Sequence, residues 1–327
     1  MDKRRRILPW VVLVIVGVAA VVWHWSEPEP SYQGRSLNEW LSRCHESHED
    51  WEFTPDDIEA EKAIRAMGQR TIPILLRMLR TRESMFGHDL YNLVCRQSWL
   101  KVRFKPAHEN QYEASCGFHA LGPEAKSALP DLIRLSMDFK CMWYGNRALA
   151  CVGAEAIPAL RSNLTSEIYG LKSCAAAAVP YLESNAIALL PDLVSCLKDT
   201  NGNVRASAAH SLGQIGREPA LVVPALVAGL QDPEYGVRGF AAKALGRFGQ
   251  QPTLLVPLLV ARLQDSEPSV RIDAVHALGN FGPAAISAVP AIQRAMVMPG
   301  NESVLFQKGA KESLQKIDPT NSAANQP

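Results

Sequence analysis

Apolar and polar positions along residues 171–297 follow a helical period, and the whole pattern recurs every 33 residues. The recurring markers are a Val-Arg pair, a Leu-Gly pair, an aspartate and a proline. They stand at Val204-Arg205, Val237-Arg238 and Val270-Arg271; Leu212-Gly213, Leu245-Gly246 and Leu278-Gly279; Asp199, Asp232 and Asp265; and Pro191, Pro224, Pro257 and Pro290. Four markers on one period predict a stack of identical supersecondary units.

Each unit is expected to be a pair of helices. Val204, Ala208 and Leu212 have the spacing of one helical face, and glycine at 216, 249 and 282 is expected to end such first helices. The marker proline is expected to begin each second helix, since proline is tolerated in a first turn. The pattern continues upstream to Thr54-Pro55 and downstream to Ile317. The sequence therefore predicts an all-α fold, a right-handed α-solenoid of about seven helix pairs over residues 54–317 and a terminal helix.

The series of marker residues closely resembles HEAT repeats of the phycobilisome-lyase-like type. In the first of these units the series is Asp199, Val204-Arg205, Ala208, Leu212-Gly213 and Ile215-Gly216. The resemblance is strong over 171–297 and weaker over 55–170. The layout also resembles that of membrane-anchored HEAT-repeat proteins of the bacterial Verrucomicrobia and Planctomycetes. Membership would imply the armadillo-like fold and partner binding, and no reaction.

The chain begins with a basic cluster and an uncharged apolar run. Lys3, Arg4, Arg5 and Arg6 precede residues 7–23, which as a helix would span about 26 Å, close to the bilayer core of about 30 Å. We expect a transmembrane anchor at 7–25, with residues 1–6 in the cytoplasm and the solenoid outside it. The alternative is a cleaved signal peptide, which would release a secreted form.

Two short segments and a tail complete the predicted organisation. Residues 26–35 are expected to be an extended linker, and Ser36 and Glu39 have capping-box spacing, so a helix should begin at Leu37. Residues 36–53 would be a capping helix and loop for the solenoid. Residues 84–116 fit the repeat least well, as an insertion or an enlarged first helix, and 318–327 are expected to be a disordered tail.

Charge and cysteine content narrow the function classes. The formal net charge is +1, but residues 1–6 carry +3 and the rest of the chain −2, so the body lacks the basic surface that nucleic-acid binding needs. The seven cysteines form no CxxC pair, which argues against a zinc site or a disulfide framework. One or two disulfides stay open if the body is extracytoplasmic.

The recurring Asp and Arg markers of each repeat are expected to be structural. Each aspartate can cap a first helix, and each arginine can bridge to the aspartate of a neighbouring unit, which would form a ladder along the stack. A binding stripe is the alternative. The residues are Asp199, Arg205, Asp232, Arg238, Asp265 and Arg271.

A partner surface is expected on the second helices, which we place on the inner, concave side. Small and weakly apolar residues there, with scattered arginines, would let a partner backbone approach; tight packing of adjacent helices is the alternative. The candidates are Ala225, Leu258, Arg262 and Arg294. His210, Lys243 and His276, at one equivalent position of the first helices, are expected to point outward into solvent.

No constellation of catalytic residues, metal ligands or cofactor-binding residues stands out. Cys44–Asp50 holds thiol, imidazole and carboxylate groups but lacks a metal-binding spacing, so a solvated loop is favoured. Asn163 and Asn301 lie in glycosylation sequons, which are frequent by chance.

The sequence thus favours a membrane-anchored protein–protein interaction scaffold that binds a protein or peptide, without catalysis, cofactor, metal, nucleic acid or small-molecule substrate. Two alternatives stay open. One is a lyase-like HEAT enzyme acting on bilin-type chromophores, and the other is a nucleic-acid-binding solenoid.

Overall fold

The computed structural model describes residues 29–44, 54–82 and 105–322. The chain divides into two compact units, Met1–Thr71 and Ile72–Pro327, and the border falls between the two helices of the first predicted pair. The predicted anchor at 7–25 lies outside the described residues, as do residues 45–53 and 83–104. The anchor therefore stays a prediction.

The first unit contains a hairpin that the sequence analysis assigned to an extended linker. Strands β1 (Ser31–Tyr32) and β2 (Arg35–Ser36) pair antiparallel. Gln33 and Gly34 connect them with positive φ values of 51° and 78°, the geometry of a tight two-residue hairpin turn. The linker prediction missed this hairpin because Gln33 is not one of the residues that usually mark the first position of such a turn, and a two-residue strand leaves no alternating pattern to detect.

Helix α2 (Leu37–Leu41) begins where the capping box predicted. Ser36 Oγ accepts from the Glu39 N–H, and Glu39 accepts from the Ser36 N–H. Trp40 is the centre of this unit's core, 1% exposed, and its indole N–H donates to the Tyr32 carbonyl at 3.1 Å. Helix α3 (Pro55–Met67) packs against α2 and begins with the predicted Thr54-Pro55 cap. The 3-10 turn η1 (Gly68–Thr71) ends the unit.

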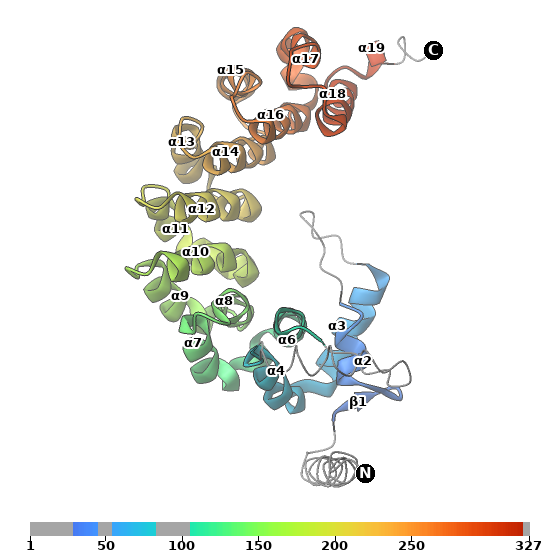
Figure 1. The fold of residues 1–327 in the computed structure, drawn as a ribbon, viewed down its shortest axis with the longest axis vertical. Helices are drawn as coiled ribbons and strands as arrows, with labels where there is room; N and C mark the ends of the chain where they lie inside the picture. Colours follow the sequence, from blue (N-terminus) through green and yellow to red (C-terminus); the bar gives the residue numbers. More distant parts are fainter. Residues whose placement is uncertain (1–28, 45–53, 83–104, 323–327) are drawn as a thin grey trace, which may run out of the picture. The chain divides into compact units, whose positions relative to one another are not determined.

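The second unit alternates first and second helices (Figure 1). The first helices are α6 (Ala107–Leu121), α8 (Met142–Cys151), α10 (Tyr169–Ala178), α12 (Gly202–Ile215), α14 (Tyr235–Phe248), α16 (Pro268–Asn280) and α18 (Val304–Ile317). The second helices are α4 (Ile72–Leu79), α7 (Leu129–Met137), α9 (Ile157–Leu164), α11 (Leu190–Cys196), α13 (Pro219–Gly229), α15 (Pro252–Arg262) and α17 (Val289–Met296). Together with α3, the described helices match the predicted order of seven pairs and a terminal helix. A last short helix, α19 (Pro319–Ser322), lies in the segment predicted to be disordered.

Two of the predicted second-helix starts were wrong. Pro191 and Pro290 stand in the first turn of α11 and α17, as expected, but Pro224 and Pro257 lie inside α13 and α15. These two helices begin five residues earlier, at a second proline, after residues Glu218 and Gln251 in left-handed backbone conformation. The corresponding segments elsewhere are the 3-10 turns η2 (Gly122–Ala128), η3 (Ala154–Ala156), η4 (Val179–Leu189) and η5 (Gly282–Ala288).

The core of the second unit runs along the stack. The predicted first-helix stripe is buried in α12, where Val204, Ala208 and Leu212 are each 0% exposed. The same positions are buried in α14 and α16. Leu226 and Leu259 of the second helices are 0% exposed and close the core from the other side. Burial at about 25 cal/mol per Å² of apolar surface makes this stripe the main stabilising term of each repeat.

Consecutive first helices approach one another closely because of glycine. A Cβ on Gly213 would lie 2.6 Å from the Ala244 Cβ, and a Cβ on Gly246 would lie 2.5 Å from the Ala277 Cα. A Cβ on Gly279 would lie 2.8 Å from the Ser313 Cβ. The Leu-Gly marker of the repeat therefore records a site where a neighbouring helix leaves no room for a side chain.

This close approach overturns the predicted placement of the inner face. First helices pack on each other all along the unit, whereas neighbouring second helices are spaced more widely. Within the second unit the row bends toward the closely spaced side, so α12, α14, α16 and α18 lie on its inner side (Figure 1). The second helices, which the sequence analysis placed inside, lie on the outer side.

One described stretch, Tyr169–Cys196, is long and apolar enough to cross a membrane by length and composition, and 44% of its best window is buried. It is not one continuous helix, because the 3-10 turn η4 between α10 and α11 is broken at Glu183, whose φ is 53°. Buried helices of soluble repeats meet the same criterion, so this stretch is assigned to the stack.

Candidate functional site

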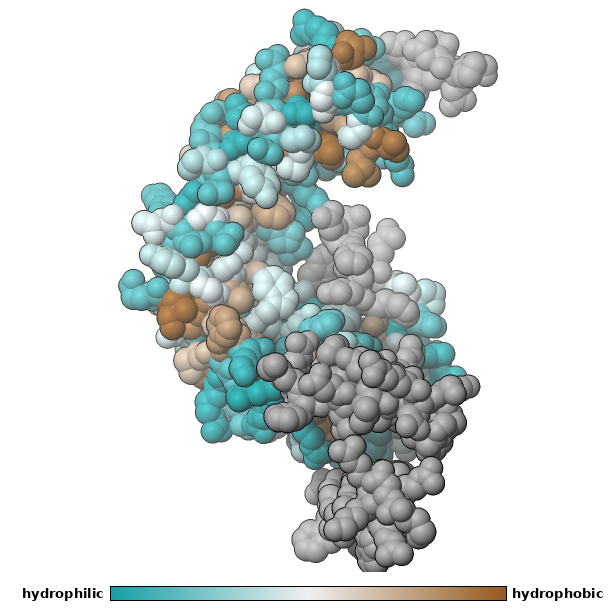
Figure 2. Space-filling view, in the orientation of Figure 1, coloured by the Kyte–Doolittle hydropathy of each residue, from teal (hydrophilic) through white to brown (hydrophobic). Residues whose placement is uncertain are grey.

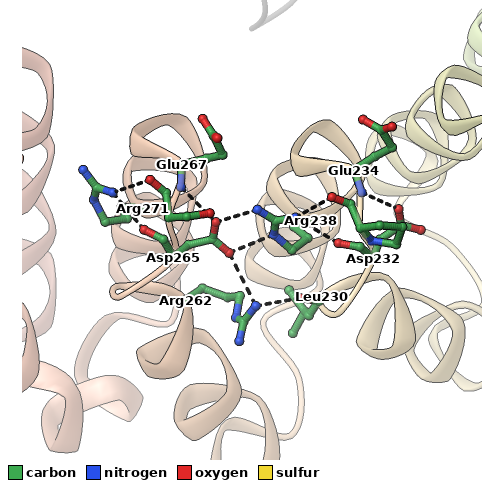
Figure 3. A network of polar contacts seen from close by, with 10 residues as sticks. Leu230, Asp232, Glu234, Arg238, Arg262, Asp265, Glu267 and Arg271 are labelled. Atoms are coloured by element: carbon green, nitrogen blue, oxygen red, sulfur yellow. Dashed lines mark hydrogen bonds and ion pairs between the residues drawn. The ribbon is translucent and has the colours of Figure 1, made fainter.

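The marker arginines and aspartates join successive repeats in one row of paired side chains, here called the ladder (Figure 3). Arg205 donates from Nε and Nη2 to both carboxylate oxygens of Asp232, each at 2.7 Å. Arg238 does the same to Asp265, at 2.8 and 2.7 Å. The fork of a guanidinium matches a carboxylate in this geometry. Each joint between these repeats is therefore held by a bidentate ion pair.

Each ladder arginine also binds the backbone of its own repeat. Arg238 Nη1 donates to the carbonyls of Asp232 and Pro233, at 2.9 and 3.0 Å. The aspartate in turn accepts a backbone N–H two residues later, as Asp232 does from Glu234 at 2.9 Å. The aspartates thus fix the loop before the first helix, and they do not cap its first-turn amides as expected. The polar groups of the ladder are therefore engaged in hydrogen bonds and ion pairs within and between repeats.

The two ends of the ladder use residues that the sequence analysis did not assign to it. Lys172 Nζ donates to Asp199 at 2.6 Å at the upstream end. At the downstream end Arg271 donates to Asn301 Oδ1 at 2.6 Å and to the Gly300 carbonyl at 2.7 Å. Asn301 occupies the place of the aspartate after the insertion at Pro299-Gly300, which removes it from the 33-residue register. Lys172 and Asn301 could have been found in the sequence by looking, at each end of the ladder, for a residue able to donate to Asp199 or to accept from Arg271.

Electrostatics keep the ladder carboxylates ionised. Burial raises the pKa of Asp232, but the hydrogen bonds from Arg205 and from the Glu234 N–H lower it by more, and the net pKa is below its usual value. The same balance lowers the pKa of Asp265 and Asp199. The Asp265 side chain is 3% exposed, so its charge depends on the arginine partner.

The four predicted partner-binding residues differ in their burial and in their contacts. Arg262 donates to the Leu230 carbonyl at 3.0 Å and to Asp265 at 3.4 Å, so it belongs to the joint between repeats (Figure 3). Arg294 is exposed on α17, and Ala225 and Leu258 are half-buried on α13 and α15. All four lie on the outer row of second helices.

The solvent-exposed faces of α8, α10, α12, α14, α16 and α18, here called the first-helix face, lie on the inner side of the bend. His210, Lys243 and His276 belong to it, at the equivalent position of three helices. They were expected to point into solvent, but the His210 ring lies 4.8 Å from the Phe240 ring of the next first helix. His276 covers Gly309, where a Cβ would lie 2.8 Å from Nε2. These side chains both face the inner side and contact the following repeat.

Arg147 of α8 occupies the same position of its helix, in a different setting. Its guanidinium carbon lies 5.2 Å from the Tyr112 ring centre and 4.7 Å from that of Tyr181, within the range of a cation–π contact. Its one hydrogen-bond acceptor among the described residues is the Cys116 sulfur at 3.8 Å. Its buried Nε has no acceptor in this part of the chain. Sequence reasoning missed this residue because the repeat pattern drifts upstream of 171.

The buried thiols are poor nucleophiles. Burial raises the pKa of Cys151 to about 12, and that of Cys141 and of Cys196 to about 11. A thiol with such a pKa stays protonated at neutral pH and packs as a small hydrophobe. Cys151 contacts His119 at 3.8 Å between sulfur and Nδ1, which places a thiol and an imidazole together without activating the thiol.

Both sequon asparagines are structural in the folded chain. Asn163 is 6% exposed and donates to Ser136 Oγ and Asn146 Oδ1, at 3.0 and 2.9 Å. Asn301 is 1% exposed and donates to the Ala295 carbonyl at 2.8 Å. Their amide nitrogens are therefore engaged inside the fold, and a glycan on either would require the local repeat to open.

Within residues 29–44, 54–82 and 105–322, no three His, Cys, Asp or Glu side chains gather closely enough to hold a metal ion. Most of the Cys44–Asp50 segment lies outside these ranges.

Comparison with known proteins assigns the repeats. The family profile for HEAT repeats matches residues 190–259 and 223–308. No curated protein sequence matches the chain at a significant level. Among solved structures, an engineered protein of the Northeast Structural Genomics Consortium is similar with 23% identity and a TM-score of 0.44, over 58% of this chain and 96% of that one. A designed armadillo repeat protein is similar with 18% identity and a TM-score of 0.41, over 76% of this chain and 100% of that one. The HEAT-repeat profile thus matches residues 190–308, the part of the stack whose helix pairs the ladder joins.

Proposed function

We propose that this chain is a membrane-anchored scaffold whose HEAT repeats bind a partner protein, and that it catalyses no reaction. The observation that carries the proposal is the first-helix face. Successive first helices expose side chains at equivalent positions, while the ladder consumes the recurring Asp and Arg groups in joints between repeats. A repeat stack of this kind presents one continuous surface, which suits the binding of an extended partner.

The anchoring part of the proposal rests on the sequence. The basic residues 3–6 followed by the apolar run at 7–25 favour a helix that crosses the membrane once, with its N-terminus in the cytoplasm. The repeats would then lie outside the cytoplasm, next to the membrane. The phycobilisome-lyase-like assignment stays a resemblance of the sequence and carries no part of this proposal.

Partner binding is tested by photo-crosslinking in cells that express the full chain. A photoreactive amino acid at His276, on the first-helix face, is expected to give a discrete crosslinked partner after purification. The matched position is Leu258 on the outer row, where no such product is expected. Products at neither position, or only at Leu258, would contradict binding through this face.

Anchoring is tested on the same cells by alkaline extraction and protease treatment. The full-length chain is expected to stay in the membrane pellet, and its repeats to be digested by protease added from outside the inner membrane. A shorter chain in the soluble fraction would mean that the segment is cleaved, and protection of the repeats in intact spheroplasts would contradict the proposed orientation.

A further inference from the structure

The first-helix face contains one arginine whose charge the described fold leaves without an anion. Every ladder arginine donates to four oxygens, as Arg238 does to both carboxylate oxygens of Asp265 and to the carbonyls of Asp232 and Pro233. Arg147 reaches one thiol and two tyrosine rings, and no described carboxylate lies within ion-pair distance of it. A partly buried guanidinium with an unsatisfied Nε is costly unless an anion compensates it.

Two large apolar side chains are exposed at the start of α8, which carries this arginine, and at the start of the next first helix. Trp143 lies one turn before Arg147 on the same face of α8, and it is 53% exposed. Tyr169, at the start of α10, is 50% exposed. The starts of the two helices are adjacent, because a Cβ on Gly170 would lie 3.8 Å from the Met142 sulfur. Hydrophobic residues also interrupt the hydrophilic surface in the region of α7–α10 in Figure 2.

We propose that Trp143, Arg147 and Tyr169 form a docking site for a protein segment that presents a carboxylate beside a large apolar side chain. This inference rests on the proposed partner binding and names the chemistry of the partner. Trp, Tyr and Arg are the residues that dominate binding energy at protein interfaces. The apolar side chain of the segment packs on Trp143 and Tyr169, and its Asp or Glu side chain binds the guanidinium.

Charge complementarity favours an acidic segment over a basic one. The positions equivalent to Arg147 in α12, α14 and α16 are His210, Lys243 and His276, whereas α10 has Ala177 and α18 has Glu312 there. Asp273 and Glu312 are acidic groups near the downstream end of the same face. The binding site is therefore placed at the upstream end, where Arg147 stands among tyrosines.

The test is a selection of displayed random dodecapeptides on the full chain, held in nanodiscs. The selected peptides are then measured as fluorescent synthetic peptides against variants. Enrichment of Asp or Glu beside a large apolar residue is expected. Affinity is expected to fall about tenfold or more in Arg147→Met, which keeps the length of the side chain and removes its charge, and in Trp143→Ala. Arg294→Met, an exposed arginine on α17, is the matched control and is expected to change affinity less than about twofold.

Several results would overturn the inference. These are selected peptides without acidic residues, unchanged affinity in Arg147→Met and Trp143→Ala, or a selection that yields no peptide. Loss of affinity in Arg294→Met alone would move binding to the outer row and leave the proposed scaffold function standing. Tighter binding of a single-stranded oligonucleotide than of the peptides, lost in Arg147→Met, would assign the site to nucleic acid. Trp143 is exposed, so its variant stays informative if Arg147→Met lowers the unfolding temperature.

Discussion

At the scale of single residues, the ladder shows how the marker residues of each repeat are used. A guanidinium at 12% side-chain exposure and a carboxylate at 3% exposure form the Arg238–Asp265 joint. Such a pair gains little over an apolar contact of the same shape, but loss of one partner leaves the other charge buried and alone. The pair therefore fixes the register of two repeats, and its removal is expected to be costly.

The substitution Arg238→Ala is expected to lower the free energy of unfolding by about 3 kcal/mol, because it leaves the Asp265 carboxylate without its bidentate partner. Urea unfolding followed by circular dichroism measures it. The control is Arg134→Ala, which removes an exposed pair with Asp131 and is expected to cost about 0–1 kcal/mol. Equal losses in the two variants would contradict a structural role for the ladder.

The ladder also predicts a pH dependence. The folded chain lowers the pKa of Asp199, Asp232 and Asp265. Their contribution to stability is therefore fully present above the unfolded pKa of about 3.9 and is lost as the pH falls through the lower folded pKa. The stability difference between the wild-type chain and Arg238→Ala is expected to narrow in urea titrations between neutral pH and about pH 3. A difference that stays constant would mean that Asp265 is not ionised in the folded wild type.

At the scale of elements, glycine sets how closely the first helices pack. Gly246 lies in the interior of α14, where glycine is less favourable than alanine by about 0.5–1 kcal/mol. Its position against the Ala277 backbone in α16 explains why the repeat keeps it. The gain comes from the packing of two helices, and it cannot be deduced from one helix alone.

Gly246→Ala is expected to destabilise the chain by about 1–3 kcal/mol, since the added Cβ would lie 2.5 Å from the Ala277 Cα and force α14 and α16 apart. Gly236→Ala in the same helix is the matched control. Its Cβ would meet its nearest neighbour, the Ala206 Cβ, at 3.9 Å, so it is expected to be neutral or stabilising by up to about 1 kcal/mol. Thermal unfolding compares the two, and equal effects of the two substitutions would contradict close packing against Ala277 as the role of Gly246.

The elements also show what the sequence could predict. The helix pairs were predictable because Val204, Ala208 and Leu212 have the spacing of one buried helical face and the same spacing recurs every 33 residues. The starts of α13 and α15 were not, since Pro219 and Pro224 are both compatible with a first turn and packing decides between them. The inner row was assigned wrongly because the direction of bending depends on contacts between helices, such as Gly213 with Ala244. Arg147 was missed because the repeat pattern drifts upstream of 171 and because its tyrosine neighbours come from two other elements, α6 and η4.

At the scale of the whole repeat stack, stability depends on each repeat covering the next. In such an array every unit contacts only its neighbours, and an end unit needs one polar face. Helix α18 has this character. It buries Phe306, at 1% exposure, and Ala310, at 0%, and it shows Lys308, Lys311 and Glu312 to solvent.

A chain that ends after Met298 is expected to lose this cover. It lacks α18, so Gly279 loses its contact with Ser313, and it lacks Asn301 and Gly300, so Arg271 loses two acceptors. The uncovered face of α16 is apolar, and an uncovered apolar face promotes association. We expect a lower unfolding temperature and concentration-dependent association in size-exclusion chromatography. A chain that ends after Ser322 keeps α18 and α19 and is expected to behave as the full chain does. If both truncated chains matched the full chain, α16 would not need a cover, and the stack would not be stabilised by contacts between neighbouring repeats.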